Sequence, residues 1–155
     1  MIFYECDADE TLLKFILKEI PKKEFEHKHG KGNVLKWIFK AEKSIGLIDR
    51  DEDSHKSGHY RRLTELDFSD QFRYTLFSVP NGNKIIELDP RLENWILRIS
   101  DLSEVDPTHY GLSRDVNRFK EQINLDSRKL EKLLIPLENS EHLLKLKEIL
   151  LDNLG

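Results

Sequence analysis

Apolar, strand-like segments alternate with amphipathic helical patterns through residues 1–100, and this alternation constrains the fold more than any other feature. The clearest strand segments are Met1–Glu5, Ser44–Ile48, Tyr74–Val79 and Lys84–Leu88, with a weaker one at Glu24–Lys28. Strands that are joined through helices pair in parallel with right-handed crossovers. The sequence therefore predicts an α/β fold, in which helices flank an open, mostly parallel four-stranded sheet whose strands end at one shared edge.

Helix starts are expected where capping residues precede an apolar stripe. The expected starts are Asp7 with Glu10 three positions later, Asn33, and Asp89 followed by Pro90. A further short helix is predicted from Tyr60 to Leu66. These helices would cover the two faces of the sheet.

Beyond Asp101 the alternation gives way to helical patterns alone. A polar loop is predicted for residues 101–114, and Pro136 is expected to separate the last helix, Glu141–Leu154, from the helices before it, 115–123 and 127–134. The broad leucine face of the last helix is expected to pack on the sheet or on its neighbour, with a partner or dimer surface as the alternative. We thus expect a main domain at residues 1–100 and a helical extension, packed on it, at residues 101–155.

Composition limits the cellular setting and the size of the core. A chain of 155 residues with 38% apolar and 35% charged side chains has material for one core. Cys6 is the single cysteine, which excludes a disulfide framework and a cysteine-rich zinc site. No leader-like segment and no apolar run of about 18 residues is present, so we expect a cytoplasmic protein without membrane association.

Three aspartates, Asp49, Asp51 and Asp53, follow the segment Ser44–Ile48 at alternate positions. Glu5 ends the first strand segment, and Glu93 falls in the first turn of the helix after Lys84–Leu88. Like charges about 4 Å apart repel by roughly 1 to 4 kcal/mol per pair, so converging acids need a cation or protons. Carboxylate oxygens suit Mg²⁺ or Mn²⁺, and we therefore expect a metal site at the carboxyl edge of the sheet.

Other sequence motifs are absent or incomplete. The aspartates imitate the start of an EF-hand loop, but Ser54 and Tyr60 stand where that loop needs glycine and glutamate. Gly58 between His55 and His59 argues for a loop rather than a zinc pair. The sequence has no phosphate-binding loop for a nucleoside triphosphate and no serine-nucleophile motif.

The acidic motifs together resemble those of the Toprim domain, which is shared by topoisomerases, DnaG-type primases and OLD-family nucleases. Glu5 with Asp9 resembles the first motif, although Cys6 replaces the usual glycine after the glutamate, and Asp49-Arg-Asp51 resembles the second. Leu92-Glu93 is similar to a third motif of the OLD-like branch, with Glu87 and Asp89 as alternatives for this acid. The resemblance covers residues 1–100 and is closest to the small, nuclease-like OLD branch.

The resemblance implies hydrolysis of a phosphodiester in nucleic acid that depends on Mg²⁺ or Mn²⁺. Glu5, Asp49 and Asp51 would bind the ion and carry catalysis. The alternative for Glu5 is a role as general base instead of metal ligand. Asp9 and Glu93 would hold a second ion or orient water, as in OLD-like nucleases. The chain is too short for the extra domains of a topoisomerase or a primase, which favours a nuclease.

Four cations near the second motif are candidates for binding phosphate: Arg50, Lys56, Arg61 and Arg62. We expect nucleic acid as the partner, with DNA ahead of RNA, and the OLD-like branch adds a separate ATPase or another protein as a further partner. Two alternatives stay open. One is a non-catalytic Toprim-like protein that binds a partner through its carboxyl-terminal helices, and the other is metal-dependent phosphoryl chemistry on a nucleotide.

Overall fold

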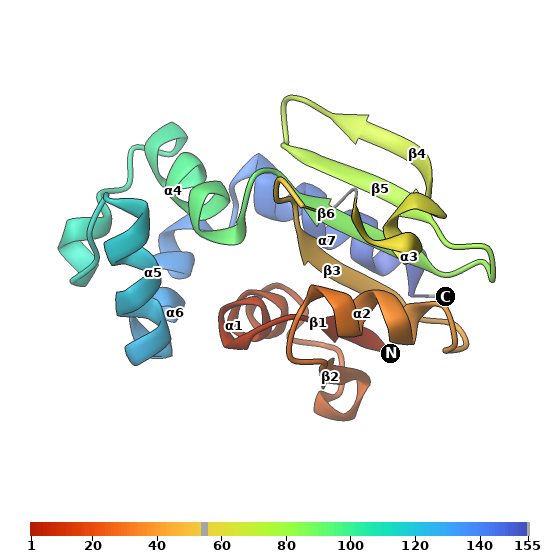
Figure 1. Cartoon of the computed structure of the whole chain (residues 1–155). Coiled ribbons are helices and arrows are strands. Elements are labelled where there is room, and N and C mark those ends of the chain that lie inside the picture. The colour runs from red at the N-terminus through yellow and green to blue at the C-terminus, as the bar shows by residue number, and fades with distance from the viewer. Residues whose placement is uncertain (54–55, 155) are drawn as a thin grey trace.

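The computed structural model describes residues 1–53 and 56–154, which form an α/β fold around one sheet (Figure 1). The strands are β1 (Ile2–Tyr4), β2 (Phe25–His27), β3 (Ile45–Asp49), β4 (Thr64–Ser69), β5 (Tyr74–Ser78) and β6 (Lys84–Leu88). They form a six-stranded sheet in the order β2-β1-β3-β6-β5-β4. The strands β2, β1, β3 and β6 are parallel, whereas β5 and β4 run antiparallel to their neighbours. The α/β class is therefore confirmed.

The prediction of a four-stranded sheet is wrong, because β4 was not expected and β5 is antiparallel. Residues 79–83 join β5 to β6, and so short a connection allows only a hairpin, since parallel strands need a crossover of a dozen or more residues. The helix predicted at Tyr60–Leu66 is also wrong: helix α3 covers Gly58–Arg61, and β4 begins at Thr64. Edge strand β4 is exposed along nearly its whole length and is bulged between Glu65 and Asp67. Its apolar side chains, Leu66 and Phe68, are about half exposed, so no buried apolar run marks the strand.

Helices cover both faces of the sheet. Besides α3, they are α1 (Asp7–Ile16), α2 (Lys31–Ile38), α4 (Leu92–Leu102), α5 (Val116–Leu125), α6 (Ser127–Leu137) and α7 (Glu141–Asn153), with 3-10 helices at Lys22–Glu24 and Pro107–Tyr110. Because side chains alternate across a strand, Ile2 and Tyr4 join a large core with α1 and α4 to α7, whereas Phe3 joins a smaller core with α2. The sheet is thus covered unequally on its two sides.

Helix α2 begins earlier than expected, and helix α4 begins later. Helix α2 begins at Lys31, directly after Gly30, whose φ of 122° suits glycine; the expected cap, Asn33, lies inside the helix and its amide donates to His29 O. Helix α4 begins at Leu92 after Arg91, not at Pro90. The Asp89 carboxylate instead forms ion pairs with two arginines, as described below.

The carboxyl-terminal helices differ from prediction at Pro136, which lies within α6 rather than ending it. The helix continues to Leu137, whose side chain is fully buried in the large core. The free energy of this burial offsets the loss of the backbone hydrogen bond that proline cannot make. Helix α4 runs to Leu102, and residues of both 1–100 and 101–155 contribute to the large core. The division of the chain at residue 100 stays a prediction.

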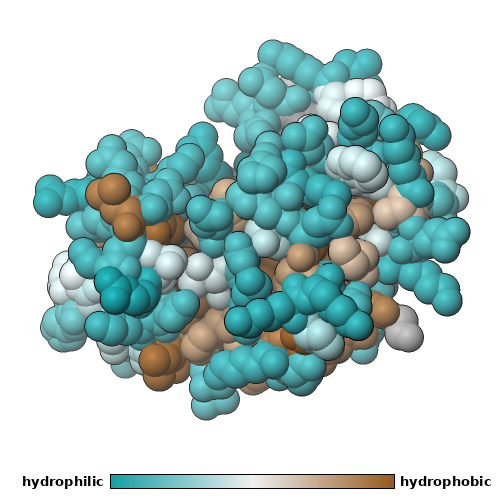
Figure 2. Space-filling model, turned by 90° about the horizontal axis from the view of Figure 1, so that it is seen from below, coloured by the Kyte–Doolittle hydropathy of each residue, from teal (hydrophilic) through white to brown (hydrophobic). Residues whose placement is uncertain are grey.

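The two ends of the described chain lie at the edge where β3 begins, opposite Asp49. The amino group of Met1 donates to Lys43 O at 3.4 Å, and Lys43 lines a small cavity together with Asn153 and Leu154. Seen from below, the surface is mostly hydrophilic, with hydrophobic residues in separate patches (Figure 2). Within residues 1–53 and 56–154, no helix combines the length and the apolar character needed to cross a membrane. His55 and Ser54 lie outside the described residues.

Candidate metal site at the carboxyl edge of the sheet

Glu5 and Asp49 meet at the carboxyl edge of the sheet. Glu5 follows β1 and Asp49 ends β3, and these strands are parallel neighbours. The Glu5 side chain crosses between them, so that its Oε2 accepts a hydrogen bond from Asp49 N at 2.7 Å. The structure therefore brings together Glu5 of the first motif and Asp49 of the second, although 44 positions separate them.

Asp9 lies in the first turn of α1 and is buried beside Glu5. Its Oδ2 accepts hydrogen bonds from Glu5 N at 3.1 Å and Cys6 N at 3.2 Å, so the capping box uses Asp9 and Cys6 rather than the expected Asp7 and Glu10. The Asp9 Oδ1 is buried and has no hydrogen-bond partner among the described residues. Burial, and then the Glu5 charge, raises the pKa of Asp9 to about 7.

Asp49 is the acid most strongly influenced by its neighbours. Its Oδ1 accepts from Leu92 N at 3.1 Å, at the first residue of α4. Burial, followed by the charges of Asp9, Glu5 and Glu93, raises the pKa of Asp49 to about 9. Glu93 is only 4% exposed, and burial also raises the pKa of Glu5. We call Glu5, Asp9, Asp49 and Glu93 the edge acids.

Asp51 lies beside the edge acids but is more exposed. Its Oδ2 contacts Lys31 Nζ at 2.6 Å, and its Oδ1 accepts from Asp53 N at 2.8 Å. The Asp51 charge raises the pKa of Glu5, whereas the Lys31 charge lowers it. Lys31 is largely buried at the start of α2, and it was not among the candidate residues found from the sequence. Gly30, which permits the turn into α2, was the available signal.

The two alternatives for the third acid have other partners. Glu87 is buried on β6, where its Oε1 accepts from the Tyr60 hydroxyl at 3.1 Å and its Oε2 has no partner in the described part of the chain. Asp89 is ion-paired with Arg73 at 3.2 Å and with Arg50 at 3.7 Å. Glu93, in contrast, acts on the pKa of both Glu5 and Asp49. The assignment of Glu93 to the third motif stays a prediction.

The four predicted phosphate-binding cations are spread around the acidic loop. Arg50 faces Asp89 as described above, and Lys56 is ion-paired with Asp53 at 2.7 Å. The Arg62 guanidinium lies over the Phe39 ring, 4.9 Å from its centre, and Arg61 is also engaged in contacts. Arg50 and Lys56 keep more than half of their side chains exposed. Their role in binding phosphate stays a prediction.

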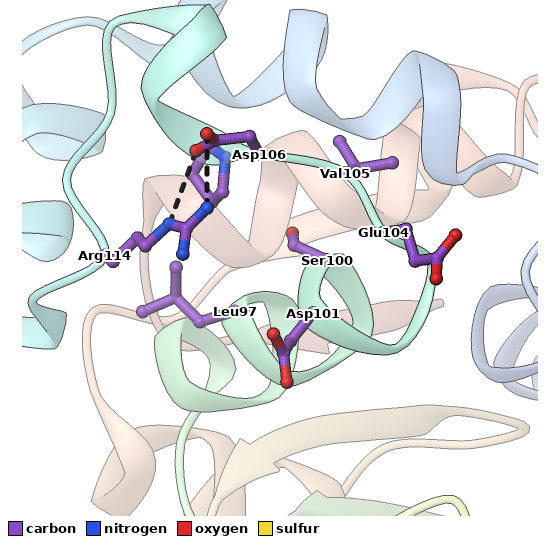
Figure 3. A pocket seen from close by; sticks show the side chains of 8 residues that line it. Leu97, Ser100, Asp101, Glu104, Val105, Asp106 and Arg114 are labelled. Carbon is purple, nitrogen blue, oxygen red and sulfur yellow. Dashed lines mark hydrogen bonds and ion pairs between the residues drawn. The ribbon is translucent and has the colours of Figure 1, made fainter.

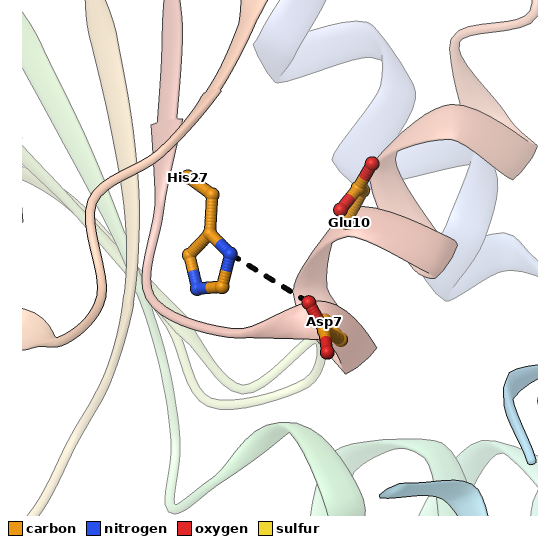
Figure 4. A group of neighbouring side chains, drawn as sticks. All are labelled: Asp7, Glu10 and His27. Atoms are coloured by element: carbon orange, nitrogen blue, oxygen red, sulfur yellow. Dashed lines mark ion pairs between the residues drawn. The ribbon is translucent and has the colours of Figure 1, made fainter.

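A second group of side chains was not expected from the sequence. Within residues 1–53 and 56–154, Asp7, Glu10 and His27 form the group of three metal-ligand types whose atoms lie within 4.8 Å of one another (Figure 4). This group, here the His27 cluster, could hold a metal ion. Asp7 and Glu10 are three residues apart on α1, which was the signal in the sequence, but pairing of β2 with β1 brings His27 to them. The edge acids do not reach this spacing.

The cavity at the end of α4 lies apart from both groups. It has a volume of about 580 Å³ and is lined by residues that include Leu97, Ser100 and Asp101 (Figure 3). Arg114 is ion-paired with Asp106 at 3.2 Å across one side of it. Hydrogen bonds from Thr108 and the nearby Arg114 lower the pKa of Asp106 to about 2, so this carboxylate remains charged and paired.

Comparisons with protein-family models, with curated proteins and with solved structures give no match to this chain. The resemblance to Toprim domains therefore depends on the acidic motifs and their placement alone.

Proposed function

We propose that this chain is a Toprim-like, nuclease-type protein, in which the edge acids hold Mg²⁺ or Mn²⁺ for hydrolysis of a phosphodiester in nucleic acid. The observation that carries the proposal is the convergence of four carboxylates at one edge of the sheet, of which Asp9 and Glu93 are buried and Glu5 and Asp49 are partly buried; Asp9 Oδ1 has no hydrogen-bond partner among the described residues. Buried carboxylates repel one another unless protons or a cation neutralise them. Of protons and a cation, a divalent cation is the one that can also take part in hydrolysis of a phosphodiester.

The donor set matches a hard divalent ion. All four side chains offer oxygen atoms, which Mg²⁺ and Mn²⁺ prefer to nitrogen or sulfur. Such an ion, when bound, stabilises charge on phosphodiester oxygens and makes a bound water more acidic. In this proposal Glu5 binds the ion or accepts a proton from that water; its contact with the Asp49 amide and the nearby Lys31 charge support this role. The carboxylates would have to turn inward, since they lie farther apart than the His27 cluster.

The cations around the site suit a polyanionic substrate. Lys31 contacts Asp51 and influences Glu5 and Glu87, so it holds positive charge next to the acids. Arg50 and Lys56 are exposed and are offered here as phosphate contacts. We place DNA ahead of RNA as the substrate, and the OLD-like branch adds a separate ATPase as a partner to be sought.

A non-catalytic interaction protein is the second candidate, favoured by the exposed apolar side chains of the carboxyl-terminal helices. Leu144 and Leu151 are seven residues apart on α7, and they are 50% and 39% exposed. Residues at this spacing share one face of a helix, as in helix-in-groove recognition. Ile135 on α6 is also exposed. In this candidate the edge acids would be neutralised by protons instead of an ion.

The test is a melting curve with and without millimolar Mn²⁺, combined with cleavage assays on single-stranded DNA, double-stranded DNA, RNA and a nucleoside triphosphate. We expect Mn²⁺ to raise the melting temperature, and Asp49→Asn to abolish both this rise and cleavage. Asp70→Asn is the matched control, because Asp70 is exposed and pairs with Arg73 away from the edge acids. Absence of any effect of Mg²⁺ or Mn²⁺ on the wild-type protein would favour the interaction protein, and cleavage of the triphosphate alone would favour nucleotide chemistry.

A further inference from the structure

The His27 cluster differs from the edge acids because it includes an imidazole nitrogen. Its members come from β2 and the first turns of α1, which are brought together by the pairing of β2 with β1 (Figure 4). His27 and Glu10 are half-buried, while Asp7 is exposed with 80% of its side chain accessible. The cluster is therefore open to solvent on the Asp7 side and supported by the sheet on the His27 side.

The orientation of the His27 ring is fixed from outside the cluster. Its Nε2 lies 2.9 Å from the Glu5 carbonyl oxygen, which can only accept, so Nε2 must carry the proton of this hydrogen bond. In the neutral ring the lone pair is then on Nδ1, which faces the Asp7 carboxylate. Metal-binding histidines are held in the same way, with the second ring nitrogen donating to a backbone carbonyl.

The distance between Nδ1 and Asp7 is suited to an ion between them. His27 Nδ1 and Asp7 Oδ1 are 3.6 Å apart, which is longer than a hydrogen bond. Two ligand atoms on one tetrahedral zinc are about 3.3 Å apart, given bonds of about 2.0–2.1 Å. A lone pair and a carboxylate facing each other at this separation repel, and an ion bound by both would remove the repulsion.

The groups around the cluster already engage one of its ligands, Glu10. Glu10 already forms an ion pair with Lys14, and the Tyr4 hydroxyl is hydrogen-bonded to it. His29 stacks on the His27 ring with ring centres 3.9 Å apart, so it covers one face of the ring but not its edge. Glu10 would therefore be the weakest of the three ligands, because it must share its carboxylate between Lys14 and the ion.

A cavity adjoins the cluster and would give access to an ion bound there. Asp7 and Glu10 line it together with Thr11, Lys14 and residues of the segment 123–135, and its volume is about 680 Å³. Three protein ligands leave a fourth position to water or to a ligand in this cavity. Sites that keep such an open position are typical of ligand binding or catalysis, whereas purely structural zinc sites are closed by protein ligands.

The geometry points to a transition-metal site at Asp7, Glu10 and His27 that takes Zn²⁺ or a similar borderline ion and is separate from the edge acids. An imidazole with carboxylates selects zinc, cobalt or nickel over magnesium, whereas the all-oxygen edge acids have the opposite preference. The site lies next to the acidic edge, because the carbonyl that holds His27 belongs to Glu5. It does not depend on nuclease activity, since its ligands are not the edge acids.

The experiment is a calorimetric titration of the full chain with Zn²⁺ in the presence of excess Mg²⁺, which occupies oxygen-only sites. We expect one Zn²⁺ per chain in the wild-type protein. His27→Gln and Asp7→Asn should each weaken binding by at least about tenfold, as much as loss of a supporting partner costs at known sites. Asp7 is exposed, so its variant keeps the fold even if the His27 variant does not.

The matched control is His109→Gln, because His109 is an exposed histidine that faces Asp106 at 3.9 Å on a distant segment. We expect it to bind Zn²⁺ as the wild type does. Asp49→Asn should also retain Zn²⁺, even where it loses the Mn²⁺ response, so that failure of this inference is distinguishable from failure of the proposed function. A histidine nitrogen NMR spectrum should show the Nδ1 signal of His27 moving on addition of Zn²⁺.

Two results would overturn the inference. One is a wild-type protein that binds no stoichiometric Zn²⁺, which would make Asp7 and His27 an ordinary ion pair. The other is Zn²⁺ binding that survives both His27→Gln and Asp7→Asn but is lost in Asp49→Asn, which would place the ion at the edge acids.

Discussion

Asp49 combines two roles in one side chain, because it ends a central strand and also accepts the first amide of α4. Both roles hold the carboxylate inside the protein, where the neighbouring acids oppose its ionisation. Asp9 is held in the same way by two amides at the start of α1. The hydrogen bonds that define the local structure therefore also hold the charges close together.

The stability of the ion-free protein should fall as pH rises. Asp49 has an ordinary pKa of 3.8 and a folded pKa of about 9, so between these values the folded state binds the extra proton. Its stabilising contribution is complete below about pH 4 and is lost as pH increases, by about 1.4 kcal/mol per pH unit for one proton. Melting curves in EDTA between pH 5 and pH 8 should show this slope.

Asp49→Asn removes the titrating carboxyl group and should flatten the slope. Some slope will remain, because the pKa of Asp9 is raised to about 7 and acts in the same direction. Equal slopes in the variant and the wild type would mean that Asp49 is not the crowded acid described above.

At the level of residues, the sequence predicted the acids but not their partners. Glu5 and Asp49 could be placed together because parallel strands end at one edge, which depends only on chain order. The contact of Lys31 with Asp51, and that of Tyr60 with Glu87, depend on how α2 and α3 sit on the sheet. Amphipathic patterns identify the buried face of a helix but not its position along a strand.

Among the elements, β3 and α2 are packed closely through Gly46. A Cβ at this position would lie 3.0 Å from Val34 Cγ1 and 3.5 Å from Ile85 Cγ1, both in the smaller core. The close approach brings the start of α2, with Lys31, to the end of β3. The glycine therefore contributes to the position of the candidate site as well as to packing.

Gly46→Ala should destabilise the fold by about 1–3 kcal/mol, because the added methyl group overpacks a filled core. Gly32→Ala is the matched control, since a Cβ there meets no described atom within 4 Å and alanine favours helix. Urea denaturation gives both free energies of unfolding. A Gly46 variant as stable as the Gly32 variant would show that α2 shifts freely on β3.

Sequence reasoning missed β4 and the direction of β5 for two different physical reasons. Strand β4 is an exposed edge whose apolar side chains, Leu66 and Phe68, stay about half exposed, so the sequence shows no buried run there. The antiparallel direction of β5 follows from the short connection after it, which the sequence displayed at Pro80-Asn81-Gly82. Buried strands were found because their apolar runs are continuous.

For the molecule as a whole, the carboxyl-terminal helices complete the larger core. Leucines and isoleucines of α5, α6 and α7 pack with residues of α1, α4 and the sheet. A chain that ends at residue 100 would expose the apolar faces of α1 and α4 to water. We expect such a chain to lose cooperative thermal unfolding, measured by circular dichroism. A sharp transition in the shortened chain would instead support an independent domain at residues 1–100.

Met1 and Leu154, the first and last described residues, lie at the rim where β3 begins, beside Lys43 and away from Asp49. An affinity handle or a fluorescent label joined near Met1 or Leu154 would leave the opposite rim, which carries the edge acids, uncovered. Protein tethered to a sensor surface through either end would present that rim to the bulk liquid, an arrangement suited to measuring nucleic-acid capture directly.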